Sequence, residues 1–211
     1  MEKSSIKKIW YVLIVGITAA GLLFVFNNAV RETVRSSAAY WFLTDKVATP
    51  VMRKLDPETA HTLAIDLLKH NLAPVDSKQD DHILQTTVWG LQFSNPLGVA
   101  AGLDKQAQAM HGLLQMGFGF VEVGGVTPEP QSGNPKPRMF RLPEDHAVIN
   151  RYGLNSDGQT TVAARLATFK QQPAIGIIGV NIAKNTTSED VIGDYKKGIQ
   201  NFGANVDFIV L

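Results

Sequence analysis

The residues best placed to do chemistry lie in the segment NPLGVAAGLDK, residues 95–105. Residues 96–101 form an apolar run bounded by proline and glycine, which predicts a short buried strand. Small side chains end that strand, so a flat ligand could lie against bare backbone there: Ala100, Ala101 and Gly102. Lys105 would place a cation beside such a ligand, although its spacing alone is better explained by a solvated lysine at a helix start.

A second segment, GFGFVEVGGVTP at residues 117–128, repeats this scheme. Its apolar strand ends at Gly124 and Gly125. Parallel strands of α/β folds carry their ligands at the carboxyl ends. Two such strands that both end in glycine therefore predict one shared pocket.

Three asparagines, Asn150, Asn155 and Asn181, lie near strand ends or in a long connection. An amide side chain both donates and accepts hydrogen bonds, which suits a ring of alternating C=O and N–H groups. Taken singly, each is more often a turn residue or a helix cap. The residue types alone leave both interpretations open.

The elements that would position these residues alternate between strand and helix. We expect strands over residues 96–101, 119–124, 175–182 and 206–211, and helices over residues 104–115, 157–170 and 188–201. This is parallel βα alternation, and it predicts an α/β fold. Residues 126–156 form a connection too long to be idle, with a small hairpin over 138–142 and 147–150. Because loops at this end of a barrel carry function, we expect a wall or lid of the site.

An apolar segment lies near the N-terminus, where residues 9–30 contain no charged side chain. As a helix it would span about 33 Å, enough to cross a bilayer. Lysines precede it and aromatic residues begin it, as at a membrane interface: Lys3, Lys7, Lys8, Trp10 and Tyr11. A secretory signal peptide is the competing interpretation, but the run is long and no clear cleavage site follows. We expect a retained membrane helix, in a mitochondrial inner membrane or, alternatively, a bacterial plasma membrane.

Residues 31–76 predict short helices, one of which begins at Asp56 and Pro57, an N-cap and a first-turn proline. The residues that follow have the spacing of an amphipathic helix: Ala60, Leu63, Ala64, Leu67 and Leu68. Either these helices pack as small additions on a larger domain, or they form a pair beside the membrane whose apolar faces admit a lipid-soluble molecule. A polar boundary follows at residues 77–81, and residues 83–93 predict a hairpin at the bottom of a barrel.

Composition narrows the possible function classes. Apolar residues make up 45% and charged residues 18% of the chain, which is typical of a globular protein with a hydrophobic appendage. The formal net charge of +1 gives no electrostatic case for binding nucleic acid. The chain has no cysteine, which excludes disulfides, thiolate metal sites and a cysteine nucleophile, and we expect no metal site.

Several motifs, in one order along the chain, resemble those of the class 2 dihydroorotate dehydrogenases. Besides the two segments that end in glycine, they are GNPKPR at residues 133–138, RLPED at 141–145, VINRYG at 148–153 and GVNIAKN at 179–185. The match runs, with gaps, from Asp56 to the last residue. The absence of cysteine agrees with this class, because the soluble class uses a catalytic cysteine and the membrane-bound class a serine.

The resemblance implies a membrane-bound oxidoreductase of pyrimidine biosynthesis, a flavoprotein that oxidises dihydroorotate to orotate with FMN and reduces ubiquinone. Its fold would be a (β/α)8 TIM barrel, of which this chain carries about the first four βα units. The implied organisation is a basic N-terminus and transmembrane helix (1–30), a helical quinone-tunnel subdomain (31–76) and the N-terminal half of an FMN-binding barrel (77–211). The implied partners are dihydroorotate and orotate, ubiquinone and the lipid bilayer.

The resemblance also implies roles for individual residues. Flavin binding would fall to Ala100, Ala101, Gly102, Lys105, Gly124, Gly125, Asn150 and Asn181. Substrate binding would fall to Lys105, Asn150, Leu154 and Asn155. Quinone binding would fall to His61 and Arg141. Without the resemblance, His61 would be interpreted as a structural histidine and Arg141 as a surface arginine. Three residues depart from the family pattern, where Gly125 replaces a serine or threonine, Leu154 a phenylalanine and Met52 a glutamine.

The catalytic base of the family is a serine, which removes a proton from C5 of dihydroorotate while hydride passes from C6 to the flavin. It lies in a loop after the fourth strand, and here residues 206–211 are both the fourth predicted strand and the end of the sequence. We therefore expect that serine beyond Leu211 and assign no catalytic residue. We expect this sequence to be the N-terminal portion of the enzyme. Two alternatives stay open: a catalytically inactive membrane-anchored protein derived from the enzyme, and an FMN barrel that acts on another dihydropyrimidine.

Overall fold

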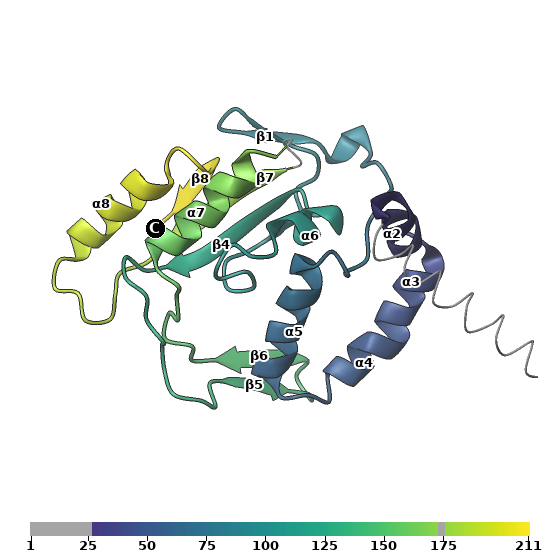
Figure 1. The fold of residues 1–211 in the computed structure, drawn as a ribbon, viewed down its shortest axis with the longest axis horizontal. Coiled ribbons are helices and arrows are strands. Elements are labelled where there is room, and N and C mark those ends of the chain that lie inside the picture. The colour runs from purple at the N-terminus through teal and green to yellow at the C-terminus, as the bar shows by residue number, and fades with distance from the viewer. Residues whose placement is uncertain (1–26, 173–175) are drawn as a thin grey trace, which may run out of the picture.

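A parallel sheet is the central element of the structure, a computed structural model that describes residues 27–172 and 176–211 (Figure 1). Its strands follow one another in chain order: β3 (Gly98–Val99), β4 (Phe120–Val126), β7 (Ile177–Ile182) and β8 (Phe208–Val210). Each neighbouring pair is parallel. The connections carry the helices α6 (Met110–Gln115), α7 (Gln159–Lys170) and α8 (Val191–Phe202). Sequential parallel strands joined by helices are the arrangement of a β/α barrel, which confirms the predicted α/β fold of barrel type.

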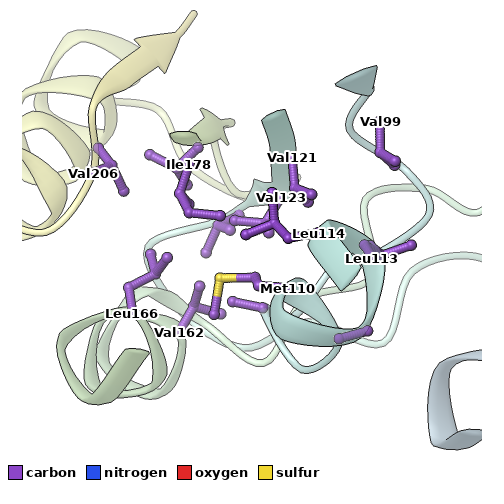
Figure 2. Close-up of a cluster of buried hydrophobic side chains, with 14 of the residues drawn as sticks. Val99, Met110, Leu113, Leu114, Val121, Val123, Val162, Leu166, Ile178 and Val206 are labelled. Carbon is purple, nitrogen blue, oxygen red and sulfur yellow. The ribbon is translucent and has the colours of Figure 1, made fainter. Parts of the chain in front are cut away.

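One face of the sheet packs against these helices and forms the core (Figure 2). Val121 and Val123 of β4 and Ile178 of β7 meet Leu113 of α6 and Leu166 of α7, and all five are at most 3% exposed. Because side chains alternate along a strand, every second residue of β4 and β7 points into this layer. Each fully buried side chain of this kind contributes about 1.5–3 kcal/mol, so the core fixes which strand residues face the other way.

The other face of the sheet carries aromatic rings and glycines. Phe120 of β4 lies edge-on to Phe93 and Phe208, with ring centroids 5.6 and 6.1 Å away. Gly98 and Gly179 make room for these rings, because a Cβ on either glycine would strike Phe120 or Phe208. The predicted hairpin is confirmed as a 3-10 turn and two antiparallel strands: η2 (His82–Leu84), β1 (Thr86–Val88) and β2 (Leu91–Phe93). An apolar pocket of about 310 Å³ opens between this hairpin and the rings.

A run of helices precedes the hairpin: α2 (Asn28–Arg35), α3 (Ala38–Leu43), the π-helical η1 (Thr44–Ala48), α4 (Thr49–Met52) and α5 (Pro57–Lys69). The segments α3, η1 and α4 follow one another without a break. Side-chain oxygens of Asn27, Ser37 and Asp56 accept backbone N–H groups at the starts of α2, α3 and α5. The predicted N-cap at Asp56 is therefore confirmed.

Two contacts attach these helices to the sheet domain. Arg35 of α2 is buried, and its guanidinium donates to the Ala73 carbonyl at 2.6 Å and to Gln115 Oε1 of α6 at 3.0 Å. Helix α5 lies directly on α6, where the Leu68 carbonyl oxygen would come within 2.5 Å of any Cβ added to Gly112. The helical run is thus held through both its first helix and its last.

Apolar side chains of the helical run also face outward. Phe42, Leu43, Val47 and Val51 of α3, η1 and α4 are each more than half exposed. On α5 the predicted apolar face is only partly right, since Leu63 is exposed. The side chains of α5 that are buried are Ala60, Ile65 and Leu68.

The long connection between β4 and α7 folds as expected into a hairpin. Its strands β5 (Met139–Leu142) and β6 (Ala147–Asn150) pair antiparallel, and β5 packs against α5 (Figure 1). Backbone hydrogen bonds in both directions between Gln131 and Ser156 close the base of the connection. Helices of the N-terminal run therefore contact this connection as well as α6.

Several expected elements are shorter than the sequence predicts, and β8, for example, covers Phe208–Val210 of the predicted 206–211. Strand β3 covers only Gly98–Val99 of the predicted 96–101, and the helix predicted over 104–115 begins at Met110. The start at residue 104 is wrong because the buried Asp104 carboxylate accepts the N–H groups of Gln108 and Ala109, which holds turns instead of helix. Ala107 within those turns has a φ of +55°, which a helix does not allow.

Most of the apolar segment 9–30 lies outside the described residues, and its last residues, 28–30, begin α2. Within residues 27–172 and 176–211, none of the helices has both the length and the hydropathy needed to cross a bilayer.

Candidate functional site

The carboxyl ends of β3 and β4 are joined by backbone hydrogen bonds. The Gly102 N–H donates to the Gly124 carbonyl at 2.9 Å, and the Gly124 N–H donates to the Asp104 carbonyl at 3.2 Å. Both glycines have a φ of +111°, a backbone conformation that side chains with a Cβ rarely adopt. The two glycine-ended strands therefore lie side by side at their carboxyl ends, and the shared ligand pocket predicted there stays a prediction.

The neighbouring strand β7 adds an amide to this edge. Asn181 pairs with Gly124 in the sheet, and its Nδ2 donates to Glu122 Oε1 at 3.2 Å. Because an ionised carboxylate only accepts, this bond fixes which end of the Asn181 amide faces Glu122. The Asn181 Oδ1 is on the side of Gly125, where an added Cβ would come within 3.1 Å of it. Asn181 thus presents an acceptor oxygen beside the glycines.

Lys105 lies half-buried in the turns between β3 and α6. The turns are anchored by Asp104, which is 1% exposed and whose carboxylate accepts the N–H groups of Gln108 and Ala109 at 2.8 and 2.7 Å. Burial raises the pKa of Asp104, although these hydrogen bonds oppose the rise. Burial also lowers the pKa of Lys105, and the positive charge of Arg138 lowers it further. The site thus contains a lysine in an environment unfavourable to its charge, as is common at binding sites.

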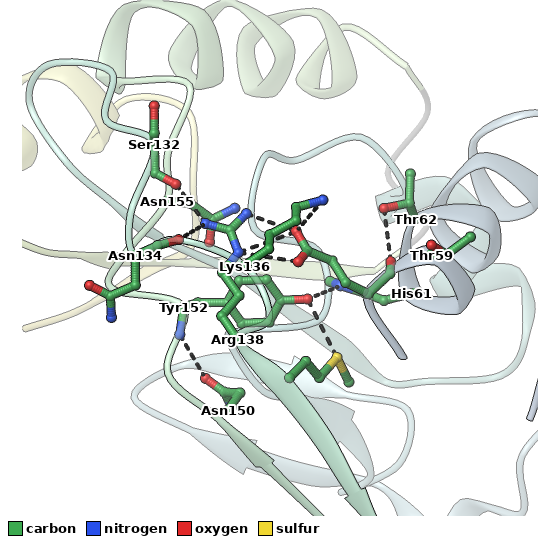
Figure 3. A network of polar contacts seen from close by, with 12 residues as sticks. Thr59, His61, Thr62, Ser132, Asn134, Lys136, Arg138, Asn150, Tyr152 and Asn155 are labelled. Atoms are coloured by element: carbon green, nitrogen blue, oxygen red, sulfur yellow. Dashed lines mark hydrogen bonds and ion pairs between the residues drawn. The ribbon is translucent and has the colours of Figure 1, made fainter. Parts of the chain in front are cut away.

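Tyr152 connects Lys105 to helix α5, and its contact with His61 of that helix is drawn in Figure 3. The Lys105 Nζ lies 4.8 Å from the centroid of the Tyr152 ring. The Tyr152 hydroxyl lies 3.2 Å from His61 Nδ1, and His61 Nε2 lies 2.7 Å from the Leu103 carbonyl oxygen. Since a carbonyl only accepts, His61 Nε2 carries a proton. The Tyr152 hydroxyl reaches two acceptors, His61 Nδ1 and Met139 Sδ at 3.4 Å, and the imidazole nitrogen is the stronger acceptor for its single proton. Burial raises the pKa of Tyr152, which keeps its hydroxyl protonated as the donor.

An ion pair between Arg138 and Glu58 joins the same region to α5 (Figure 3). Arg138 Nη2 lies 2.8 Å from Glu58 Oε1 and Arg138 Nε 3.2 Å from Oε2, so the contact is bidentate. Arg138 Nη1 donates to the carbonyls of Ser132 and Asn134. The Arg138 guanidinium lowers the pKa of the Glu58 carboxyl. The pair therefore holds the connection 126–156 against the helical run.

The predicted substrate residues of the long connection differ in their surroundings. Asn155 Oδ1 is buried and has no hydrogen-bond partner, and Asn155 lines a pocket of about 140 Å³ with Lys105 and His61. Leu154 is exposed, and its Cδ2 lies 3.5 Å from where a Cβ of Gly125 would be. Asn150 is exposed at the end of β6, where its Oδ1 accepts the Tyr152 N–H at 3.5 Å. A buried acceptor without a partner is the atom that a ligand N–H would satisfy.

The two predicted quinone residues make different contacts. His61 belongs to the Tyr152 network, whereas Arg141 of β5 lies at the end of α4. There the Arg141 Nη1 donates to the carbonyls of Leu55 and Arg53 at 2.6 and 3.0 Å. Arginine near the C-terminal end of a helix is electrostatically favourable. The structure therefore ties both residues to the helical run, and their contact with a quinone stays a prediction.

Sequence reasoning missed several residues of this region. Tyr152, Arg138 and Glu58 were not assigned to the site, although the first two lie in the quoted motifs, and Glu122 was missed as the partner of Asn181. The one indication in the sequence was that Glu58 lies two residues after the N-cap of α5. An acidic residue in the first turn of a helix is favourable, but this position does not point to a role in the site.

The donor set and the shape suit a flat heterocycle with polar edges. Among the glycines at the strand ends, Gly102 has open space where a Cβ would lie, which leaves backbone accessible beside β4. Asn181 Oδ1 lies beside Gly125, whereas Lys105 and Asn155 line the pocket of about 140 Å³ together with His61 and Tyr152. The residues present therefore fit the pyrimidine edge and planar ring of a flavin.

Comparison with known proteins gives one consistent family. A family model described as dihydroorotate dehydrogenase matches residues 83–211. The dihydroorotate dehydrogenase (quinone) of Rhodospirillum rubrum is 47% identical over 173 residues, which cover 82% of this chain and 46% of that protein. The mitochondrial dihydroorotate dehydrogenase (quinone) of Mus musculus is 46% identical over 175 residues, 81% of this chain and 44% of its own.

Solved structures agree with this result. The crystal structure of the Eimeria tenella enzyme in complex with ferulenol superimposes with a TM-score of 0.70 and 42% sequence identity, covering 73% of this chain and 43% of the other. The chain spans about half the length of the curated relatives it matches. With its motifs, its sequential parallel sheet and these matches, the chain belongs to the dihydroorotate dehydrogenase family, in the quinone-dependent class.

Proposed function

We propose that the protein of which this chain forms part oxidises dihydroorotate to orotate with bound FMN and delivers the electrons to ubiquinone. The observation that carries the proposal is the junction of the two glycine-ended strands with half-buried Lys105 beside them. That junction is also connected, through Tyr152 and His61, to the helical run that exposes apolar side chains. In this proposal one network thus links the substrate site to the helical run.

The flavin would be held by backbone and small side chains of the strand ends. These are Ala100, Ala101, Gly102, Gly124 and Gly125, with Lys105, Asn150 and Asn181 as polar partners. FMN, when bound, supplies two-electron carrier chemistry that no side chain of this chain offers. Lys105 would stabilise negative charge at the pyrimidine edge, and the Asn181 Oδ1, fixed by Glu122, would accept a hydrogen bond from an N–H or O–H group.

The substrate would bind on the side of the long connection. Dihydroorotate carries a carboxylate, ring carbonyls and ring N–H groups, so it needs a cation, donors and acceptors. Lys105 supplies the cation, Asn150 and Asn155 supply amides, and Leu154 supplies an apolar wall. The buried Asn155 Oδ1 is an acceptor that a ring N–H would satisfy. In this proposal the residues named here bind and orient the substrate, and none of them is its catalytic base.

Ubiquinone would approach through the helical run, which covers residues 31–76. Residues 77–211 would form the barrel portion. Phe42, Leu43, Val47 and Val51 give α3, η1 and α4 an apolar outer surface. His61 and Arg141 would lie where that surface meets the barrel. Residues 1–30 would anchor the protein in a bilayer as a single-pass helix. Both mitochondrial and bacterial relatives exist, and we favour the mitochondrial inner membrane over a bacterial plasma membrane.

Replacing Lys105 in the protein with the complete barrel tests this proposal. Anaerobic reduction of the bound flavin by dihydroorotate should be slowed about 100-fold in Lys105→Ala, because one positioned charge at the reacting edge is lost. Lys196→Ala, an exposed lysine on α8, is the matched control and should react like wild type. If the flavin of Lys105→Ala is reduced at the wild-type rate, the site assignment is wrong. A wild-type flavin that dihydroorotate does not reduce would refute the function itself.

A further inference from the structure

We propose that Tyr152 is a positioning residue for both halves of the reaction, whose ring places the Lys105 ammonium on the substrate side and whose hydroxyl places the His61 imidazole on the quinone side. The inference rests on the proposed function and assigns a role to a residue that sequence patterns did not single out. The inference is based on the location of Tyr152. Its side chain is buried, with 7% exposed, and it lies where three segments that are distant in sequence meet. These are α5, the turns between β3 and α6, and the connection between β4 and α7.

The ring of Tyr152 holds Lys105 without neutralising it. The Lys105 Nζ lies 4.8 Å from the ring centroid, within the range of a cation–π interaction. A carboxylate at the same place would bind the ammonium more strongly, but it would also compete with an anionic ligand for it. An aromatic face attracts the ammonium and leaves its charge available. This suits a lysine that has to meet the carboxylate of a substrate.

A second cation fixes the ring itself. The Arg138 Cζ lies 4.9 Å from the same centroid, and Arg138 is held in turn by the bidentate pair with Glu58. The position of the ring is therefore set by a buried ion pair and does not depend on Lys105. Rigid support of this kind is what a positioning residue requires.

The hydroxyl of Tyr152 determines the state of His61. Its single proton can go to His61 Nδ1 at 3.2 Å or to the weaker acceptor Met139 Sδ at 3.4 Å, and we assign it to Nδ1, while His61 Nε2 donates to the Leu103 carbonyl. Leu103 is two residues before Lys105, so the imidazole is held between the tyrosine and the turns that carry the lysine. The two bonds fix one tautomer and one ring orientation of His61. The substrate side and the quinone side are thereby connected through one side chain.

Two substitutions separate the two ends of Tyr152 in the holoenzyme. Tyr152→Phe keeps the ring and removes the hydroxyl, whereas Tyr152→Leu removes both. Tyr152→Phe should slow flavin reoxidation by ubiquinone about 2- to 10-fold, the effect of one lost hydrogen bond. Its affinity for orotate, measured by calorimetry, should stay within about twofold of wild type because the cation–π contact is kept. Tyr152→Leu should in addition weaken orotate binding about 2- to 30-fold.

Tyr195→Phe on α8 is the matched control, since Tyr195 packs against the core away from this network, and it should match wild type in both measurements. FMN content and the thermal midpoint are recorded for every variant. If Tyr152→Leu does not fold, Tyr152→Phe decides by itself, because the inference requires a loss in reoxidation without a loss in orotate affinity.

Equal losses in both measurements for Tyr152→Phe, or no loss in reoxidation, would overturn the role of Tyr152. These outcomes differ from a failure of the proposed function, which would appear in the wild type as a flavin that dihydroorotate does not reduce. That failure would overturn the inference with it.

Discussion

Glu58 shows how one side chain can hold the site region together. Its carboxylate is 14% exposed and lies against two nitrogens of Arg138, with Lys136 at 3.3 Å from the same carboxylate. Arg138 in turn supports the Tyr152 ring. Removing one partner of a largely buried ion pair leaves the other charge without compensation, and this penalty is larger than the net contribution of the intact pair.

We predict that Glu58→Gln lowers the free energy of unfolding by about 2 kcal/mol at pH 7. Arg138 holds the pKa of Glu58 below its ordinary value in the folded state, so the charged carboxylate stabilises the fold above the unfolded-state pKa of about 4.3. That contribution is lost as the pH falls through the lower folded-state pKa. The difference between wild type and variant should therefore narrow below about pH 4.

Urea denaturation between pH 7 and pH 3 measures this difference. Glu189→Gln, at an exposed position before α8, is the control and should change stability little at any pH. A gap between wild type and Glu58→Gln that is constant with pH would show that the pair stabilises by packing and not by charge.

At the residue scale, the sequence predicted what lies within one motif and missed what lies between motifs. The strand and the turn that carry Lys105 and the glycines could be predicted from their own segment, whereas the assignment of Lys105 to the site came from the family resemblance and stays a prediction. Tyr152 could not, because its role depends on Lys105, His61 and Arg138, which come from three separate segments. An aromatic residue in a loop looks the same whether it fills a gap or supports a cation.

At the scale of elements, the contact of α5 with α6 positions the helical run. Gly112 lies where the two helices are closest, with the Leu68 carbonyl carbon 3.0 Å and its oxygen 2.5 Å from any added Cβ. Both atoms belong to the backbone of α5, so they cannot turn away as the end of a side chain would. A methyl group at this position would have to separate the helices.

We predict that Gly112→Ala destabilises the protein by about 1–2 kcal/mol, because the cost of overpacking exceeds the gain in helix propensity of up to about 1 kcal/mol. The sign is the test, since glycine to alanine within a helix normally stabilises. Ala164→Gly, at an exposed site in α7, measures the propensity term in the same protein and should cost about 1 kcal/mol. Denaturation midpoints of both variants give the comparison. A more stable Gly112→Ala would mean that α5 and α6 are not in contact as described.

The elements themselves were largely predictable, since strands β4 and β7 and helices α7 and α8 lie within three residues of their expected bounds. Their apolar periods are long enough to specify the type of element. The start of α6 was not predictable, because Asp104 reads as an ordinary N-cap. Whether its carboxylate meets the N–H groups of a helix or of a turn depends on its burial, which local sequence does not contain.

For the whole molecule, the two faces of the sheet differ in how completely they are covered. The helix-facing side is closed by α6, α7 and α8, while the other side has the rings of Phe93, Phe120 and Phe208 around an apolar pocket of about 310 Å³. Within the described residues, β3 and β8 each pair on one side only. In a closed barrel, further strands would pair with both edges and cover the rings.

We predict that the 211-residue chain produced alone associates with itself and binds the dye ANS, whereas a chain extended to the length of its relatives does neither. Unpaired edges of a parallel sheet beside exposed aromatic rings favour intermolecular contacts. Light scattering in detergent above its critical concentration measures association, and dye binding is the ANS fluorescence in excess of that of the micelles alone. The outer face of α3, η1 and α4 is a second apolar surface, so Phe42→Ser with Val51→Ser serves as the control. Association that persists in this double variant comes from the sheet, whereas association that disappears comes from the helical run. If the 211-residue chain stays monomeric and binds no dye, the half-barrel closes its own core. Its edges and rings would then not be exposed enough to drive assembly.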